Sequence, residues 1–238
     1  MMKKYFMELL LLASGITAGA QNIQLHYDFG RNIYTGEEAG RPKATITLEQ
    51  FKADQWGTWF YFVDIDLSSH FFETAYTEIS REFNLGKQSP FAAHIEYNGG
   101  ISRNGGSFQQ AALAGIAYNW HSADFSKMWV VQLMYKQFFK SYDYTHSYAS
   151  AQVTTVWSLP FANKKLTFAG MAEAWRSEKA NRHGCIAFLA EPQLWYNVTD
   201  HFSVGTEWEF SYNFVHNTDP ESSKSFFWNP TLAVKWNF

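Results

Sequence analysis

The sequence predicts an all-β fold, a transmembrane antiparallel β-barrel of about twelve strands closed by a C-terminal strand that ends in Phe238. Three observations predict it. Residues 230–238 alternate apolar and polar side chains and end on an aromatic residue. Segments with the same period of two, each about as long as a tilted membrane strand, recur along the chain. No stretch after residue 20 has the apolar length of a membrane helix.

The N-terminal residues 1–20 are predicted to be a cleaved signal peptide. Lys3 and Lys4 supply a positive start, a short apolar stretch follows, and Ala18-Gly19-Ala20 matches an A-x-A cleavage site. The apolar stretch is too short to span a membrane as a helix, and Glu8 near its start is unusual for a signal. We expect export and a mature chain of residues 21–238 that forms one outer-membrane barrel domain.

Charge and cysteine content exclude several classes of function. Loss of Lys3, Lys4 and Glu8 changes the formal net charge from −3 to −4, which argues against a nucleic-acid polymer as partner. The single cysteine, Cys185, permits no internal disulfide and no Cys/His zinc spacing. We therefore expect no cofactor and no metal site.

The strands are justified by their alternation. In the first, Leu25 and Tyr27 share one face while His26 and Asp28 share the other. The same pattern continues to the C-terminus. The strands expected from it are 23–29, 44–51, 59–67, 76–85, 92–97, 111–120, 129–138, 148–157, 166–175, 186–196, 202–214 and 227–238.

Polar connections and tryptophans mark the strand ends. Residues rich in Gly, Asn, Ser or charge predict loops at 30–42, 67–74, 99–109 and 216–225. Several tryptophans lie at or near strand ends, where an aromatic girdle contacts the two membrane interfaces. Ordinary core tryptophans of a soluble sheet are the alternative. The girdle candidates are Trp120, Trp129, Trp157, Trp175 and Trp228.

The second face of the strands carries many charged and polar groups. Such groups are costly against hydrocarbon and in a dry core, so we expect them to line a wetted lumen. Acidic residues outnumber basic ones, which disfavours anions and admits cations and neutral polar solutes. Alternatively, these charges pair with one another and fill a narrow barrel, which then has a structural role and no pathway for solutes. The residues are His26, Asp28, Glu49, Asp64, Asp66, Glu78, Glu82, His94, Glu96, Gln132, Lys136, Glu173, Glu191, Gln193, Glu207, Glu209, Asn213 and Lys235.

Two phenylalanines share this polar face. Phe60 and Phe62 have the parity of Asp64 and Asp66 on the expected strand 59–67. A planar base can stack on an aromatic face for about 1–3 kcal/mol, while nearby carboxylates accept hydrogen bonds from a ribose or an exocyclic amine. The alternative is that both rings only fill space.

Four short motifs resemble the Tsx-type nucleoside-specific channel-forming outer-membrane proteins, in particular their Bacteroidetes-like branch. They are Leu25-His26-Tyr27-Asp28-Phe29-Gly30, Trp56-Gly57-Thr58-Trp59-Phe60-Tyr61-Phe62-Val63-Asp64, Tyr76-Thr77-Glu78-Ile79-Ser80 and Glu191-Pro192-Gln193-Leu194-Trp195-Tyr196-Asn197. The resemblance spans most of the mature chain.

The resemblance implies a narrow monomeric barrel that passes nucleosides and deoxynucleosides by diffusion, and a terminal Phe238 that is presented to the barrel-assembly machinery. Thr58 stands where the family often has an acidic residue, so the solute preference can differ. By motif position, the implied channel-lining residues are Phe60, Phe62, Asp64 and Glu78, followed by His26, Asp28, Glu191 and Gln193.

Other functions compete with a channel. Outer-membrane phospholipase A also uses a twelve-stranded barrel with a Ser/His pair, and His146, Ser147, Ser150 and His183 are available here without a spaced motif. Glu207 and Glu209 have the spacing of an acid/base pair, but alternation along strands produces such pairs routinely. An interaction barrel that binds a partner through its loops is a further alternative. We expect a channel and no enzyme.

Overall fold

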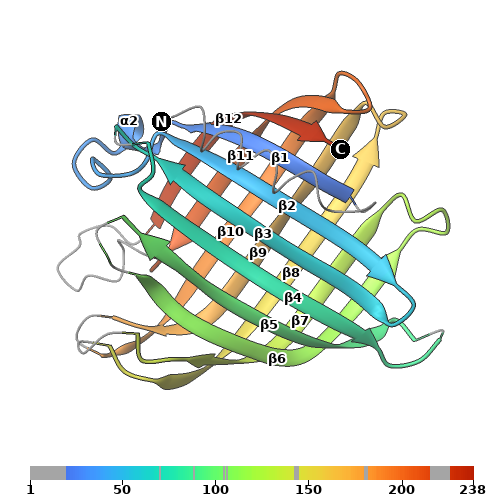
Figure 1. Ribbon diagram of the computed structural model, residues 1–238, viewed down its shortest axis with the longest axis horizontal. Helices are drawn as coiled ribbons and strands as arrows, with labels where there is room; N and C mark the ends of the chain where they lie inside the picture. The colour runs from blue at the N-terminus through green and yellow to red at the C-terminus, as the bar shows by residue number, and fades with distance from the viewer. Residues whose placement is uncertain are drawn as a thin grey trace.

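The computed structural model describes residues 20–69, 71–87, 89–103, 105, 107–141, 145–179, 182–214 and 226–238. Within them, twelve antiparallel strands form one closed barrel, in which each strand pairs with its neighbours in sequence and β1 pairs with β12 (Figure 1). This confirms the predicted fold class. The strands are β1 Ala20–Asp28, β2 Ala44–Asp54, β3 Gly57–Leu67, β4 Thr74–Asn84, β5 Phe91–Ser102, β6 Ser107–His121, β7 Met128–Phe138, β8 Tyr148–Phe161, β9 Leu166–Glu178, β10 Gly184–Asn197, β11 Phe202–Tyr212 and β12 Phe226–Asn237. The predicted signal peptide lies outside the described residues, apart from Ala20.

Each expected strand overlaps an observed one, and the clearest difference lies in the predicted loop 99–109. There β5 continues to Ser102, and its register with β6 shifts between Asn98 and Gly100. A Cβ atom on Gly100 would stand 2.4 Å from the carbonyl oxygen of Ala75 in β4. The glycine is therefore needed for close strand contact, and the prediction of a loop at this position was wrong.

The two ends of the barrel differ in their connections. Residues 55–56 join β2 to β3 at the end that also carries the start of β1 and the C-terminus, whereas the segment 29–43 joins β1 to β2 at the opposite end (Figure 1). We call these the terminal end and the loop end. The segment 29–43 contains the short helix α2 Gly30–Ile33, whose first amide donates to Asp28 Oδ1 at 2.6 Å. Among the described residues, no helix has the length and apolarity needed to cross a membrane.

The outer wall is mostly apolar, whereas the inner wall carries polar groups together with an apolar cluster of Leu113, Met134, Phe138, Trp175 and Leu189. Large side chains such as Leu133, Leu232 and Ile95 are 51–65% exposed. On the other face, His26 of β1 meets Trp195 of β10 with ring centroids 6.1 Å apart, a contact between non-adjacent strands that only the barrel interior permits. The polar face predicted from alternation therefore faces a lumen.

Four of the five candidate girdle tryptophans face outward, as a girdle requires, and one does not; Trp157 of β8 packs beside outward-facing Trp129 with ring centroids 6.2 Å apart. Trp120, Trp129 and Trp228 are 38–45% exposed on the outer wall. Trp175 is instead 8% exposed and faces inward, with the Lys136 ammonium 5.0 Å from its ring centroid. A cation over the indole face stabilises this inward position.

Candidate functional site

Four aromatic rings follow one another along one side of the lumen. Phe60 and Phe62 of β3 have ring centroids 6.1 Å apart, Phe62 and Tyr76 of β4 are also 6.1 Å apart, and Tyr76 and Phe108 of β6 are 5.4 Å apart. We call these four side chains the aromatic ladder. All four are half-buried, so part of each ring faces the lumen. Phe60 lies in the half of β3 nearer the terminal end, and Phe108 lies at the loop end of β6. The ladder therefore runs along much of the length of the barrel.

Carboxylates from five strands share the lumen with the ladder. Asp64 of β3 interacts electrostatically with Glu207 of β11, and Glu191 of β10 interacts with both of them. Glu78 of β4 and Glu191 each interact with Glu173 of β9. We call these five residues the acidic belt. When ionised, carboxylates of one sign create a negative potential that attracts cations and repels anions, and the Lys136 charge offsets part of it at Glu78 and Glu173.

Hydrogen bonds hold the belt carboxylates in place. Asp64 Oδ1 accepts from the Thr47 hydroxyl at 2.5 Å, and Glu207 Oε2 accepts from Gln193 Nε2 at 2.6 Å. Glu78 Oε1 accepts from the Tyr76 hydroxyl at 2.8 Å. Tyr76 thus belongs to the ladder and also orients a member of the belt.

One part of the lumen is filled by a polar network. His94 Nδ1 lies 3.3 Å from Glu82 Oε1, and its Nε2 lies 3.1 Å from Glu96 Oε2. Gln132 of β7 donates to Glu82 Oε1 of β4 at 3.1 Å, which links strands that are not neighbours in the barrel. His94 is only 1% exposed. This network fills part of the lumen between β4 and β7. The ladder residues and four of the five belt carboxylates are half-buried on the inner wall, whereas Glu173 is only 8% exposed.

The segment 29–43 folds inward at the loop end and binds the inner wall through Arg41. The guanidinium donates to Asp28 Oδ2 at 2.9 Å and to Glu209 Oε2 at 2.5 Å, and it lies 3.9 Å from Glu38. Burial alone would lower the pKa of Arg41, but the carboxylates of Glu209 and Asp28 outweigh burial and raise it. Burial raises the pKa of Glu38, which the Arg41 charge only partly offsets.

The candidate residues from the sequence fall into two groups. Phe60, Phe62, Asp64, Glu78, Glu191 and Gln193 are half-buried on the inner wall. The other two are buried within side-chain networks. His26 lies 3.2 Å from the Thr231 hydroxyl and 3.0 Å from Gln24 Oε1, and Asp28 is bound to Arg41.

Sequence reasoning missed Tyr76, Phe108 and Arg41. Tyr76 has the parity of Glu78 and was recognisable from alternation, whereas the shift in register between β5 and β6 concealed the face of Phe108. Arg41 lies in a connection without periodicity. No local signal shows that such a residue folds back into the barrel.

The residues named for a rival hydrolase do not form a Ser/His pair in the described structure. His146 Nε2 lies 2.9 Å from Glu178, while the hydroxyls of Ser147 and Ser150 donate to main-chain carbonyls at 2.8 and 2.6 Å. His183 lies in the connection from β9 to β10. Within the described part of the chain, no group of three or more His, Cys, Asp or Glu side chains is arranged to hold a metal ion.

Comparison with known proteins agrees with this architecture. A family model described as "Domain of unknown function (DUF5020)" matches residues 20–238. No curated protein matches the sequence. The NanC porin is a similar solved structure, with a TM-score of 0.59, 13% identity, and coverage of 92% of this chain and 100% of that chain. The KdgM porin has a TM-score of 0.49 and 11% identity, with 92% and 99% covered. At these identities the likeness concerns the fold alone.

Proposed function

The chain therefore belongs to the DUF5020 family, and we propose that it is an outer-membrane channel through which nucleosides and similar small polar solutes diffuse. The observation that carries the proposal is the aromatic ladder that shares an accessible lumen with the acidic belt. On β3 and β4 the flat aromatic surfaces lie next to carboxylate hydrogen-bond acceptors, because Asp64 follows Phe62 on the same face and Tyr76 donates to Glu78.

The outer wall supports placement in a membrane. A closed barrel leaves no unpaired sheet edge, and its exposed side chains are large and apolar around the circumference. Trp120, Trp129 and Trp228 are suited to the membrane interfaces. The porin-like fold and the expected signal peptide agree with an outer-membrane location, and Phe238 would be presented to the assembly machinery.

The lumen supports passage of neutral or cationic solutes. Crossing solutes would pass the belt, where Asp64, Glu191 and Glu207 repel anions but accept hydrogen bonds from hydroxyl and amino groups. Phosphorylated or carboxylated solutes would therefore permeate poorly. The polar network at His94 limits the cross-section, so small solutes are favoured.

The ladder supports nucleosides within that class. A nucleobase can stack on successive rings from Phe60 to Phe108, and a ribose can donate hydrogen bonds to the belt at the same time. Each stack supplies about 1–3 kcal/mol, which gives weak sites suited to transport. The motif resemblance to Tsx-type channels points to the same solutes.

The test is single-channel conductance of the refolded protein in a planar bilayer, titrated with adenosine, thymidine and glucose. We expect the nucleosides to block the current and glucose to leave it nearly unchanged. Phe62→Leu keeps apolar bulk but removes one stacking face, so the nucleoside concentration for half-block should rise about 5- to 150-fold. The matched control is Tyr61→Leu, which changes the neighbouring outward-facing aromatic residue.

Each result separates the alternatives. Equal effects of Phe62→Leu and Tyr61→Leu would contradict a role for the ladder. Conductance indifferent to all three solutes would indicate a general pore. A folded barrel without any conductance would favour the plugged structural or interaction barrel.

A further inference from the structure

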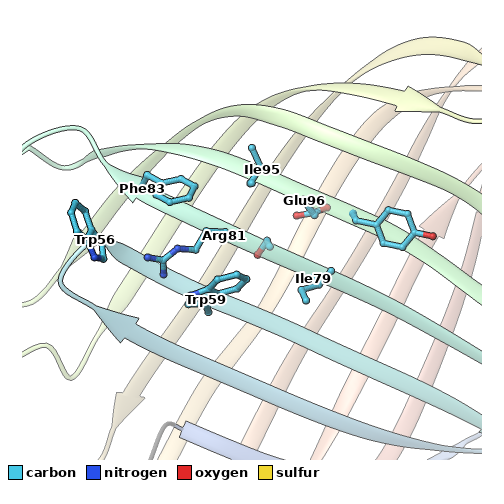
Figure 2. A pocket seen from close by; sticks show the side chains of 9 residues that line it. Trp56, Trp59, Ile79, Arg81, Phe83, Ile95 and Glu96 are labelled. Atoms are coloured by element: carbon cyan, nitrogen blue, oxygen red, sulfur yellow. The ribbon is translucent and has the colours of Figure 1, made fainter.

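The outer wall carries a groove of about 610 Å³ beside the turn between β2 and β3 (Figure 2). The groove lies outside the lumen and takes no part in the proposed passage of solutes. Its walls come from this turn and from β3, β4 and β5. Trp56 of the turn lines the groove, and the outward-facing strand residues along it are Trp59, Ile79, Arg81, Phe83, Ile95 and Tyr97.

Arg81 is the charged side chain with outward parity among the residues that line this groove. Its register partners are Trp59 in β3 and Ile95 in β5, both of which face outward, yet Arg81 itself is only 5% exposed. The guanidinium lies 5.0 Å from the ring centroid of Trp59 and 5.1 Å from that of Phe83. A charge on the membrane side of a barrel is costly near the midplane and is tolerated near the interface. Figure 2 shows the guanidinium directed toward Trp56 and the β2–β3 turn, which is the interface side.

The ion pair with Asp54 does not satisfy this guanidinium. Arg81 Nη2 donates to Asp54 Oδ1 at 2.8 Å, but the same oxygen also accepts the amides of Trp56 at 2.8 Å and Gly57 at 3.1 Å. Arg81 Nη1 is buried and has no hydrogen-bond partner among the described residues. A buried charged donor without an acceptor is a strong binding group for an anion.

We propose that the groove binds one membrane phospholipid, with its phosphate at Arg81 and an acyl chain along Ile79 and Ile95. The proposal depends on the outer-membrane placement inferred above. Short turns of such barrels face the periplasm, so Arg81 lies at the headgroup level of the periplasmic leaflet, where the lipids carry phosphate. Ile79 and Ile95 are 44% and 51% exposed and supply the apolar surface that an acyl chain covers.

The geometry also indicates how the phosphate reaches its donor. Trp56 is 65% exposed in a two-residue turn and forms the wall on the interface side. Nη1 has almost no accessible surface in this structure, so the exposed Trp56 indole has to shift before a phosphate oxygen completes the hydrogen bonding of Nη1. Trp59 and Phe83 then enclose the guanidinium from the sides. The site is specific for a phosphate joined to an apolar tail, because it provides one charged group at the end of an apolar groove.

The experiment is native mass spectrometry of the detergent-refolded barrel after incubation with dioleoyl phosphatidylglycerol, dioleoylglycerol or glycerol phosphate. We expect the wild type to retain one phosphatidylglycerol, and neither of the other two compounds. Arg81→Gln should lower retention at least tenfold. The matched control is Arg176→Gln, because Arg176 is also outward-facing and pairs with Glu178 at 3.0 Å, but it is 46% exposed and lies near the loop end, away from the groove.

A second variant, Ile95→Trp, fills the groove without changing charge and should also abolish retention. Folding of each variant is checked by heat-modifiable gel mobility. Equal retention of dioleoylglycerol would overturn phosphate recognition, and equal binding of glycerol phosphate would indicate a free-anion site. Unchanged retention in folded Ile95→Trp or Arg81→Gln would overturn the site. Lipid retention without conductance would contradict the channel proposal alone, whereas conductance without retention would contradict only this site.

Discussion

Replacement of Arg41 by glutamine is expected to release the segment 29–43 from the loop end of the lumen. Arg41 holds this segment through Asp28 and Glu209, with Glu38 nearby. Glutamine cannot neutralise the three carboxylates, which then repel one another. The barrel itself should remain folded, because its strands pair without the segment.

The magnitude follows from burial. Removing one partner of a buried ion pair costs about 3–5 kcal/mol. Because the Arg41 side chain is 20% exposed, we expect Arg41→Gln to weaken docking of the segment by a smaller amount, about 2–3 kcal/mol. This changes the ratio of docked to released segment about 30- to 150-fold. Release removes an obstruction from the loop end and should raise single-channel conductance.

Two measurements test this expectation. Hydrogen exchange should speed up at amides inside the segment, such as that of Tyr34, which donates to the Gly30 carbonyl at 2.7 Å. Conductance should rise in the same variant. Arg31→Gln is the matched control, since Arg31 carries the same charge in the same segment and, within the described part of the chain, donates to the Arg41 carbonyl at 3.2 Å and forms no ion pair. Exchange and conductance that are identical in the two variants would refute the anchoring role of Arg41.

Three further predictions concern charge, backbone and pH. Asp64→Asn should lower the cation-over-anion permeability ratio, measured as the reversal potential in a salt gradient, whereas Asp124→Asn in an exposed turn should not; equal effects would contradict the acidic belt. Gly57→Ala should destabilise the barrel by about 1–3 kcal/mol in urea unfolding, because φ is +154° and a Cβ atom would stand 2.0 Å from a carbonyl oxygen. Gly86→Ala shares that φ but has 3.6 Å of space, so a loss as large as that of Gly57→Ala would exclude the clash as the cause. The raised pKa of Glu38 means that its contribution to docking is present at low pH and is lost as pH rises through that pKa. Hydrogen exchange of amides in the segment 29–43 should therefore accelerate in the wild type as pH rises through the pKa of Glu38, but not in Glu38→Gln. Parallel pH profiles of the two proteins would disprove this role of Glu38.

Alternation made the barrel predictable. A period of two is a local property, so the first strand already shows that His26 and Asp28 share one face while Leu25 and Tyr27 share the other. The same parity places Trp175 on the inward face with Glu173, which its position near a strand end does not reveal. Strand positions, the inward polar face and the aromatic residues of β3 were therefore available from the sequence.

Only the closed barrel decided which polar residues remain accessible. His26 and Glu191 have the same polar-face parity, yet His26 is enclosed by neighbours from β12 and β10 while Glu191 is half-buried. Arg41 reaches Glu209, far away in sequence, and Arg81 is buried on a wall that alternation predicts to be apolar. These outcomes depend on which strands meet across the lumen and on where a connection folds back. Such contacts join residues distant in sequence, and a local pattern carries no information about them.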